Sequence, residues 1–201
     1  MRHSDFSNFL GLNMNTADLK MIASTLTPVK VCAELLALSI VEQVHCTGSE
    51  ISVSLSKSGG CISDTGRGIR LEPDDGYSIS HAELALTTYY PCFSENSKVD
   101  DVLSDLIWGQ HGSMGPALAN YACKNLTYLS RRSKQIWEQS YAYGLPMGAP
   151  KKLGSTLQTG TEIHFQTNGE IEIESFESII RRIKEKLPDF KIHFSASKNH
   201  E

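Results

Sequence analysis

Hydrophobic and polar positions alternate in several short stretches of the chain, and this pattern predicts strands. Residues 50–55 place apolar side chains at every second position, and a Gly-Gly turn at 57–60 leads into a second strand that ends at Asp64. The same kind of pattern predicts further strands at 126–130, 135–141, 161–166 and 191–194.

The helices are predicted by apolar spacing and by capping residues. Residues 29–45 form a long, largely apolar stretch, which predicts a core helix. Further helices are predicted at 15–23, 80–86, 116–122 and 176–187. Between Thr87 and Gly109 the chain is polar and without clear periodicity, so we expect an irregular segment there, and a lid is its natural role.

Glu34 is an acidic residue among apolar neighbours of the predicted core helix. A buried carboxylate is costly unless it has a partner or a task, so Glu34 is a candidate general base. The alternative is that Glu34 lies on an exposed edge of the helix. The sequence pattern alone leaves both open.

A carboxylate and two glycines, Asp64, Gly66 and Gly68, follow the second predicted strand. Glycines lack a Cβ, so the backbone can turn sharply and come close to a ligand. A carboxylate at the mouth of a pocket can accept a hydrogen bond from an exocyclic amine such as that of adenine. Taken by itself, the motif is also compatible with a surface turn.

A second glycine cluster, residues 109–115, leads directly into the helix predicted at 116–122. The exposed N–H groups and the positive dipole end of a helix N-terminus form an anion site, and phosphate is the anion that we expect. The spacing is not that of a Walker A loop. His111 either contacts this phosphate or satisfies the loop backbone.

Composition and charge narrow the class of protein. The 201 residues fit one domain, which we place at 25–201 after an arm and short helix at 1–24. A net charge of −4 gives no basic field, so we expect no direct DNA binding. Five cysteines without CxxC spacing predict reduced thiols, not a disulfide framework or a zinc site. No apolar run suggests a membrane span or a signal core, so the cytoplasm is the expected compartment.

Four segments together resemble one family of ATP-binding domains: residues 63–69, 109–112, 139–146 and 158–161. They are similar to the GHKL group of DNA gyrase B, topoisomerase IV, MutL, ninety-kilodalton chaperones and histidine kinases. The stretch 139–146 is most like the gyrase branch. The resemblance covers about residues 25–195 and implies an α+β fold. This is the Bergerat two-layer sandwich, with a mixed, mainly antiparallel sheet covered by helices on one face.

The resemblance also implies roles for individual residues around bound ATP. Asp64 would accept the adenine amino group, Thr161 would add a hydrogen bond, and Glu34 would activate the attacking water as the catalytic residue of an ATP hydrolase. Glu42 and Arg67 would form a structural ion pair. The remaining nucleotide-binding positions implied by the family are Gly66, Gly68 and Ile69 at the adenine wall, Gly109, His111, Gly112 and Gly115 around the phosphates, and Arg132 at the pocket opening.

The sequence departs from the family pattern where magnesium is expected. Leu38 occupies the position of the asparagine that holds Mg²⁺, and Val41 replaces an acidic residue on the same helix. Leucine offers no oxygen to a hard cation, so Mg²⁺ as a cofactor lacks its usual protein ligand. We therefore expect hydrolysis to be weak or lost, although Glu34 argues for residual turnover.

Three hypotheses remain open at this point. The first is a gyrase-B-type domain that binds adenine nucleotide. The second is a non-catalytic regulatory or interaction module that keeps the fold. The third is the ATPase fragment of a split topoisomerase, since the family's transducer and DNA-working domains lie outside this sequence. The expected partners are a second copy of the chain or topoisomerase subunits.

Overall fold

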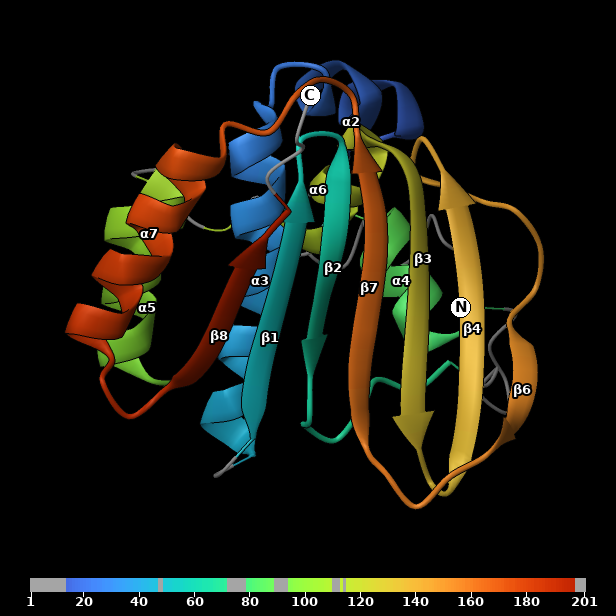
Figure 1. Cartoon of the computed structure of the whole chain (residues 1–201). Coiled ribbons are helices and arrows are strands. Elements are labelled where there is room, and N and C mark those ends of the chain that lie inside the picture. Colours follow the sequence, from blue (N-terminus) through green and yellow to red (C-terminus); the bar gives the residue numbers. More distant parts are fainter. Residues whose placement is uncertain are drawn as a thin grey trace.

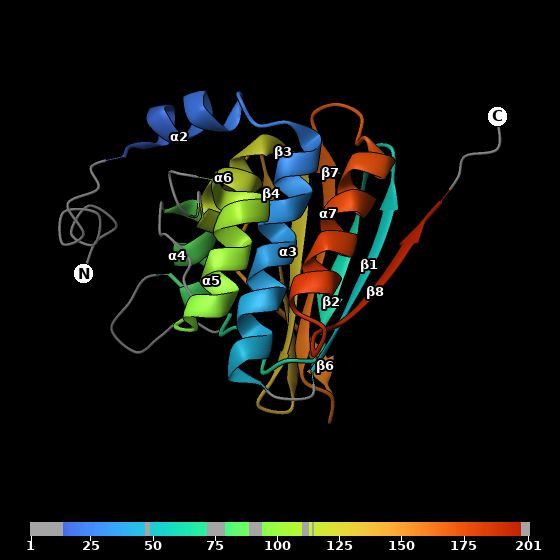
Figure 2. The same cartoon turned by 90° about the vertical axis from the view of Figure 1, so that its left-hand side faces the viewer.

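One sheet with helices gathered on one side makes up the protein (Figures 1 and 2). This arrangement is seen in a computed structural model, which describes residues 14–46, 49–71, 79–88, 94–109, 113 and 115–197. Figure 2 shows the sheet edge-on, with the helical layer beside it. The predicted α+β fold with a mixed, mainly antiparallel sheet is therefore confirmed.

The sheet has eight strands in the order β5-β4-β3-β7-β2-β1-β8, with β6 beside β4. Its pairs are antiparallel except for β1 with β8, which is parallel. The strands are β1 Glu50–Ser56, β2 Gly59–Asp64, β3 Cys123–Arg132, β4 Gln135–Ala142, β5 Leu145–Pro146, β6 Lys151–Ser155, β7 Gly160–Thr167 and β8 Lys191–Ala196. All six predicted strands are present, whereas the short β5 and β6 were not predicted.

The central helix is α3, Pro28–His45, which packs between the sheet and the other helices. Its apolar character on most sides follows from this position, because α6 and α7 contact it as well as β2 and β7. Capping confirms the predicted helix starts at Asn15 and Ser80, whose side chains accept backbone N–H bonds. The other helices are α2 Thr16–Ala23, α4 His81–Thr87, α5 Ser97–Leu103, the π-helical turn η1 Ser104–Trp108, α6 Gly115–Ala122 and α7 Ile173–Lys186.

The prediction of an irregular segment between Thr87 and Gly109 is wrong for residues 97–108. These residues are helical, and Val99, Leu103 and Trp108 are buried in the core. Apolar residues at 99, 102, 103, 106 and 107 have helical spacing, which the polar residues around them obscured. The role of a lid stays a prediction, and residues 89–93 lie outside the described part of the chain.

None of the described helices is long and apolar enough by itself to cross a membrane, although α2 and α3 together, bent by 117°, reach that length. Most of α3 is buried against the rest of the protein.

The predicted ion pair between Glu42 and Arg67 fastens α3 to the turn after β2. The Arg67 side chain donates from Nε and Nη2 to the two carboxylate oxygens at 2.9 and 2.8 Å, and its backbone N–H donates to Oε1 at 2.7 Å. Burial alone would raise the pKa of Glu42, but the Arg67 hydrogen bonds and charge outweigh it, so the pKa lies below the usual 4.5. The pair is therefore a bidentate clamp of the kind that favours the ionised carboxylate.

We predict that Glu42→Gln destabilises the protein at neutral pH and much less in acid. The folded-state pKa of Glu42 is lowered, so the carboxylate stabilises the fold above pH 4.5 and loses this effect as the pH falls through the folded value. Because Arg67 is half exposed, the deficit should be about 1 kcal/mol at pH 7. Denaturant unfolding at pH 7 and pH 3 measures it, with the exposed Glu177→Gln on α7 as the control. A deficit of equal size at both pH values would contradict the prediction.

Candidate functional site

A cavity of about 670 Å³ lies between α3, α4 and the inner face of the sheet. Its volume is in the range of small-molecule sites. Among the described residues its lining is Leu38, Glu42, Asp64, Arg67, Gly68, Ile69, Arg70, His81, Leu84, Ala85, Thr88, Tyr128, Arg132 and Thr161. The structure thus brings eight of the sequence-predicted positions to one cavity: Leu38, Glu42, Asp64, Arg67, Gly68, Ile69, Arg132 and Thr161.

Asp64 is the buried acidic group of this cavity, with 5% of its surface exposed. Its Oδ1 accepts from the backbone N–H of Gly66 at 2.9 Å and of Thr161 at 3.3 Å. Its Oδ2 accepts from the hydroxyl of Ser39 at 3.0 Å and from that of Thr161. Three separate elements therefore hold one carboxylate in place: α3, the glycine turn and β7.

Burial raises the pKa of Asp64, and the hydrogen bonds from Thr161, Gly66 and Ser39 oppose this rise. The net pKa lies above the usual value of 3.8. A carboxylate that is buried in this way depends on hydrogen-bond donors to compensate for the water it has lost. Such a group is suited to recognising an amine in an apolar surrounding.

Glycines surround Asp64 because side chains would collide there. A Cβ at Gly66 would lie 2.4 Å from Cγ of Glu42, and one at Gly160 would lie 2.0 Å from the backbone oxygen of Asp64. Gly160 also has a φ of +127°, which side-chain-bearing residues rarely adopt. Gly66 itself does not line the cavity. Its lack of a side chain allows the turn to pack against Glu42 and Asp64, which do line it.

The turn after Gly66 is anchored to β3. Arg132 donates from Nη1 to the backbone oxygen of Gly68 at 2.7 Å, and Ser130 donates to that of Ile69 at 2.6 Å. A Cβ at Gly68 would lie 2.6 Å from the Arg131 backbone oxygen, so this approach also requires glycine. Arg132 also lines the cavity, and its described contact is with the turn.

The residues at the family's magnesium position do not fit the ion. Leu38 lines the cavity with an aliphatic side chain, and Val41 is also apolar. Neither offers the oxygen ligands that Mg²⁺ requires. No described residue of the cavity on α3 apart from Glu42 carries a carboxylate, and Glu42 is committed to Arg67.

Glu34 is buried on α3 with 2% exposure, so the alternative of an exposed helix edge is wrong. Its Oε1 lies 2.9 Å from Nζ of Lys30, one helical turn earlier. Lys30 also donates to the backbone oxygen of Ile107 at the end of η1. Glu34 is not among the described residues that line the cavity, and its role as a base stays a prediction.

The second glycine cluster is described in part. Gly109 and Gly115 both have positive φ, at +71° and +76°, and α6 begins at Gly115, one residue before the predicted start. The Ser113 hydroxyl accepts from the N–H of Gly115 at 3.1 Å. Neither glycine lines the described cavity, and His111 and Gly112 lie outside the described residues.

Sequence reasoning missed Ser39 and Tyr128, and both contribute to the site. Ser39 is a buried hydroxyl that donates to Asp64, and Tyr128 is an aromatic side chain of the cavity wall on β3. The available signal for Ser39 was its own polar side chain within the apolar stretch 29–45. Tyr128 carries no such signal, because aromatic residues are common in strands.

Known proteins resemble this chain in sequence and in fold. No family model matches the chain. DNA gyrase B of Staphylococcus aureus is 28% identical over 157 residues, which are 76% of this chain and 24% of that protein. The same figures hold for DNA gyrase B of Staphylococcus epidermidis. The chain thus spans about a quarter of the length of the curated relatives it matches.

A solved structure shares the fold. The topoisomerase IV ATP-binding domain of Francisella tularensis, in complex with a small-molecule inhibitor, superposes with a TM-score of 0.66 at 16% identity. The match covers 83% of this chain and 45% of that one. Sequence similarity and the shared fold together confirm the predicted resemblance of this chain to the gyrase B branch of the GHKL ATP-binding domains.

Proposed function

We propose that the chain binds an adenine nucleotide, ATP, in the cavity beside Asp64. The observation that carries this proposal is a buried acceptor carboxylate at the wall of a cavity of about 670 Å³. Leu38, Ile69 and Leu84 supply apolar surface for a purine. Asp64 accepts the adenine amino group, and the Thr161 hydroxyl, which already bonds the same carboxylate, extends this contact.

The phosphates of the nucleotide lie toward the start of α6 in this proposal. Gly109 and Gly115 lack a Cβ and both have positive φ, and the helix N-terminus favours negative charge. His111 and Gly112 complete the phosphate contacts as predicted from the sequence. Arg132 flanks the opening of the cavity.

Hydrolysis by water that Glu34 activates is weak or lost in this proposal. Leu38 offers no oxygen to Mg²⁺, so the charge that develops on the phosphates is not neutralised in the usual way. The Glu34 carboxylate is also paired with the Lys30 ammonium at 2.9 Å, so it is already engaged within the protein.

The same two features favour a second candidate function, a non-catalytic module that keeps the fold and the purine pocket. Such a module would regulate or contact a second copy of the chain or topoisomerase subunits, in the cytoplasm. A split topoisomerase is the related alternative, in which a separate chain supplies the remaining parts. The net charge of −4 supports contact with proteins over direct contact with DNA in each case.

We predict that Asp64→Asn weakens binding of an adenine nucleotide roughly 100-fold while the fold is kept. The asparagine Oδ1 can still accept from Gly66 and Thr161, and its Nδ2 can donate to the hydroxyls of Ser39 and Thr161, which then reverse their roles. The acceptor for the adenine amine is lost.

Calorimetry with a non-hydrolysable ATP analogue measures this effect, and thermal unfolding verifies the fold. The matched control is Asp105→Asn. Asp105 is half exposed, pairs with Arg182 and does not line the cavity. Unchanged affinity in Asp64→Asn would remove Asp64 from the binding site.

We also predict that Leu38→Asn makes nucleotide affinity more dependent on Mg²⁺, by about ten-fold between metal-free and metal-saturated buffer. The new amide oxygen faces the cavity from α3, where the family holds the ion. Leu84→Asn adds the same group on α4 and should leave the Mg²⁺ dependence as it is. If Leu38→Asn behaves like Leu84→Asn, the phosphate end of the site has diverged beyond this one position.

A further inference from the structure

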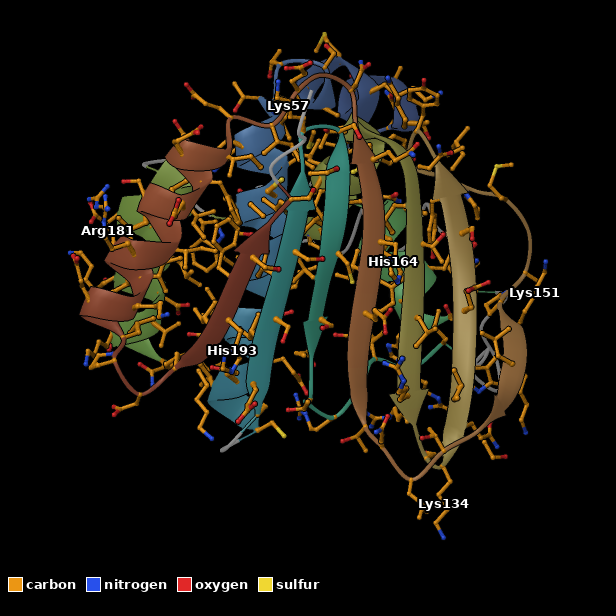
Figure 3. The ribbon with its side chains drawn as sticks, in the orientation of Figure 1. Lys57, Lys134, Lys151, His164, Arg181 and His193 are labelled. Atoms are coloured by element: carbon orange, nitrogen blue, oxygen red, sulfur yellow. The ribbon has the colours of Figure 1, made fainter. Side chains whose placement is uncertain are left out.

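The outer face of the sheet, opposite the helices, carries a cluster that the nucleotide site does not use. Cys61 of β2 pairs directly with His164 of β7, and Ser63 pairs with Glu162 in the same register. Glu162 and His164 are two residues apart on one strand, so their side chains share a face. The viewer of Figure 3 looks onto this face, where His164 on β7 and His193 on β8 are labelled.

The three side chains bring a thiol, an imidazole and a carboxylate together. Among the described residues, Cys61, Glu162 and His164 each offer one ligand atom, and these atoms all lie within 4.8 Å of one another. Cys61 Sγ is 4.0 Å from Nε2 of His164, which is 2.6 Å from Oε1 of Glu162. In a tetrahedral zinc site, bonds of about 2.0 to 2.3 Å place ligand atoms roughly 3 to 4 Å apart. Small side-chain rotations therefore suffice to surround an ion.

The surroundings of the cluster also suit a metal. Arg131 of β3 holds the other oxygen of Glu162 at 2.7 Å, which leaves Oε1 directed toward His164. Second contacts of this kind orient metal-binding carboxylates.

We propose that Cys61, Glu162 and His164 form a binding site for a zinc-type divalent cation, with a fourth position open to water or to a further ligand. Thiolate, imidazole and carboxylate are the three ligand types that Zn²⁺ combines, and three protein ligands with an open position are typical of sites that are not purely structural.

The proposed metal site joins β2 and β7, and the carboxylate of Asp64 lies at the end of β2. Asp64 pairs with Thr161 at the end of the register in which Cys61 pairs with His164. The side chains of the first pair face the helices and those of the second face away from them, since neighbouring residues alternate. A cation on the outer face therefore ties β2 to β7 three residues from Asp64.

Spacing along the sequence could not indicate this site, because Cys61 and His164 are 103 residues apart. The sequence-based argument against a zinc site considered cysteine spacing, whereas a metal can also be held across two neighbouring strands.

Titration of the purified, reduced chain with Co²⁺, followed by absorption spectroscopy, tests the proposal. A thiolate ligand gives an intense near-ultraviolet charge-transfer band, and a tetrahedral site gives visible bands; both should disappear on competition with Zn²⁺. Cys61→Ser should abolish the charge-transfer band, and His164→Ala should weaken Co²⁺ binding at least ten-fold.

Two variants serve as matched controls in this titration. Cys46→Ser removes another partly exposed thiol, and His193→Ala removes another histidine of the same face that lies near a glutamate. Both should keep the spectrum and affinity of the unchanged chain. Absence of a charge-transfer band in the unchanged chain, or its loss in Cys46→Ser instead of Cys61→Ser, would overturn the proposal. Neither result bears on nucleotide binding, because the inner cavity shares no residue with this cluster.

Discussion

The need to satisfy one buried carboxylate, Asp64, governs the arrangement of the site. A buried charge is costly unless donors surround it, and Asp64 receives its donors from α3, from the glycine turn and from β7. Each of these elements must therefore keep its place. Gly66 and Gly160 are required because any side chain there would push the donors or the backbone aside.

Under the proposed function, the same constraint explains how purine recognition can be kept while hydrolysis is weak or lost. The Asp64 cluster depends on the sheet and on Ser39, and it does not involve Leu38 or Glu34. A leucine at the proposed magnesium position therefore leaves the contacts of Asp64 intact. The Lys30–Glu34 pair is compatible with this, since it places an ammonium 2.9 Å from the carboxylate of the proposed base. A pocket of this kind can keep its ligand while it loses catalytic power.

The sequence predicted the sheet well because half-buried strands alternate regularly, as in β1 and β7. It failed for α5, whose apolar residues lie among serines and aspartates that suggest a loop. Asp64 and the ion pair of Glu42 with Arg67 could be placed through a family resemblance. The Ser39 donor and the Lys30 partner of Glu34 could not, because they depend on which side of α3 faces the sheet and on where η1 ends.

Selectivity between two purine nucleotides tests the central claim most directly. Asp64 accepts hydrogen bonds, so it should favour adenine, which carries an amine at position 6, over guanine, which carries a carbonyl there. Calorimetric titration of the unchanged chain with non-hydrolysable analogues of ATP and GTP, with the buffer matched, measures the difference. We expect the ATP analogue to bind at least ten-fold more tightly, in line with about 1.4 kcal/mol for one such contact. Equal affinity for the two analogues, or binding of neither, would contradict the assignment of the cavity as an adenine nucleotide site.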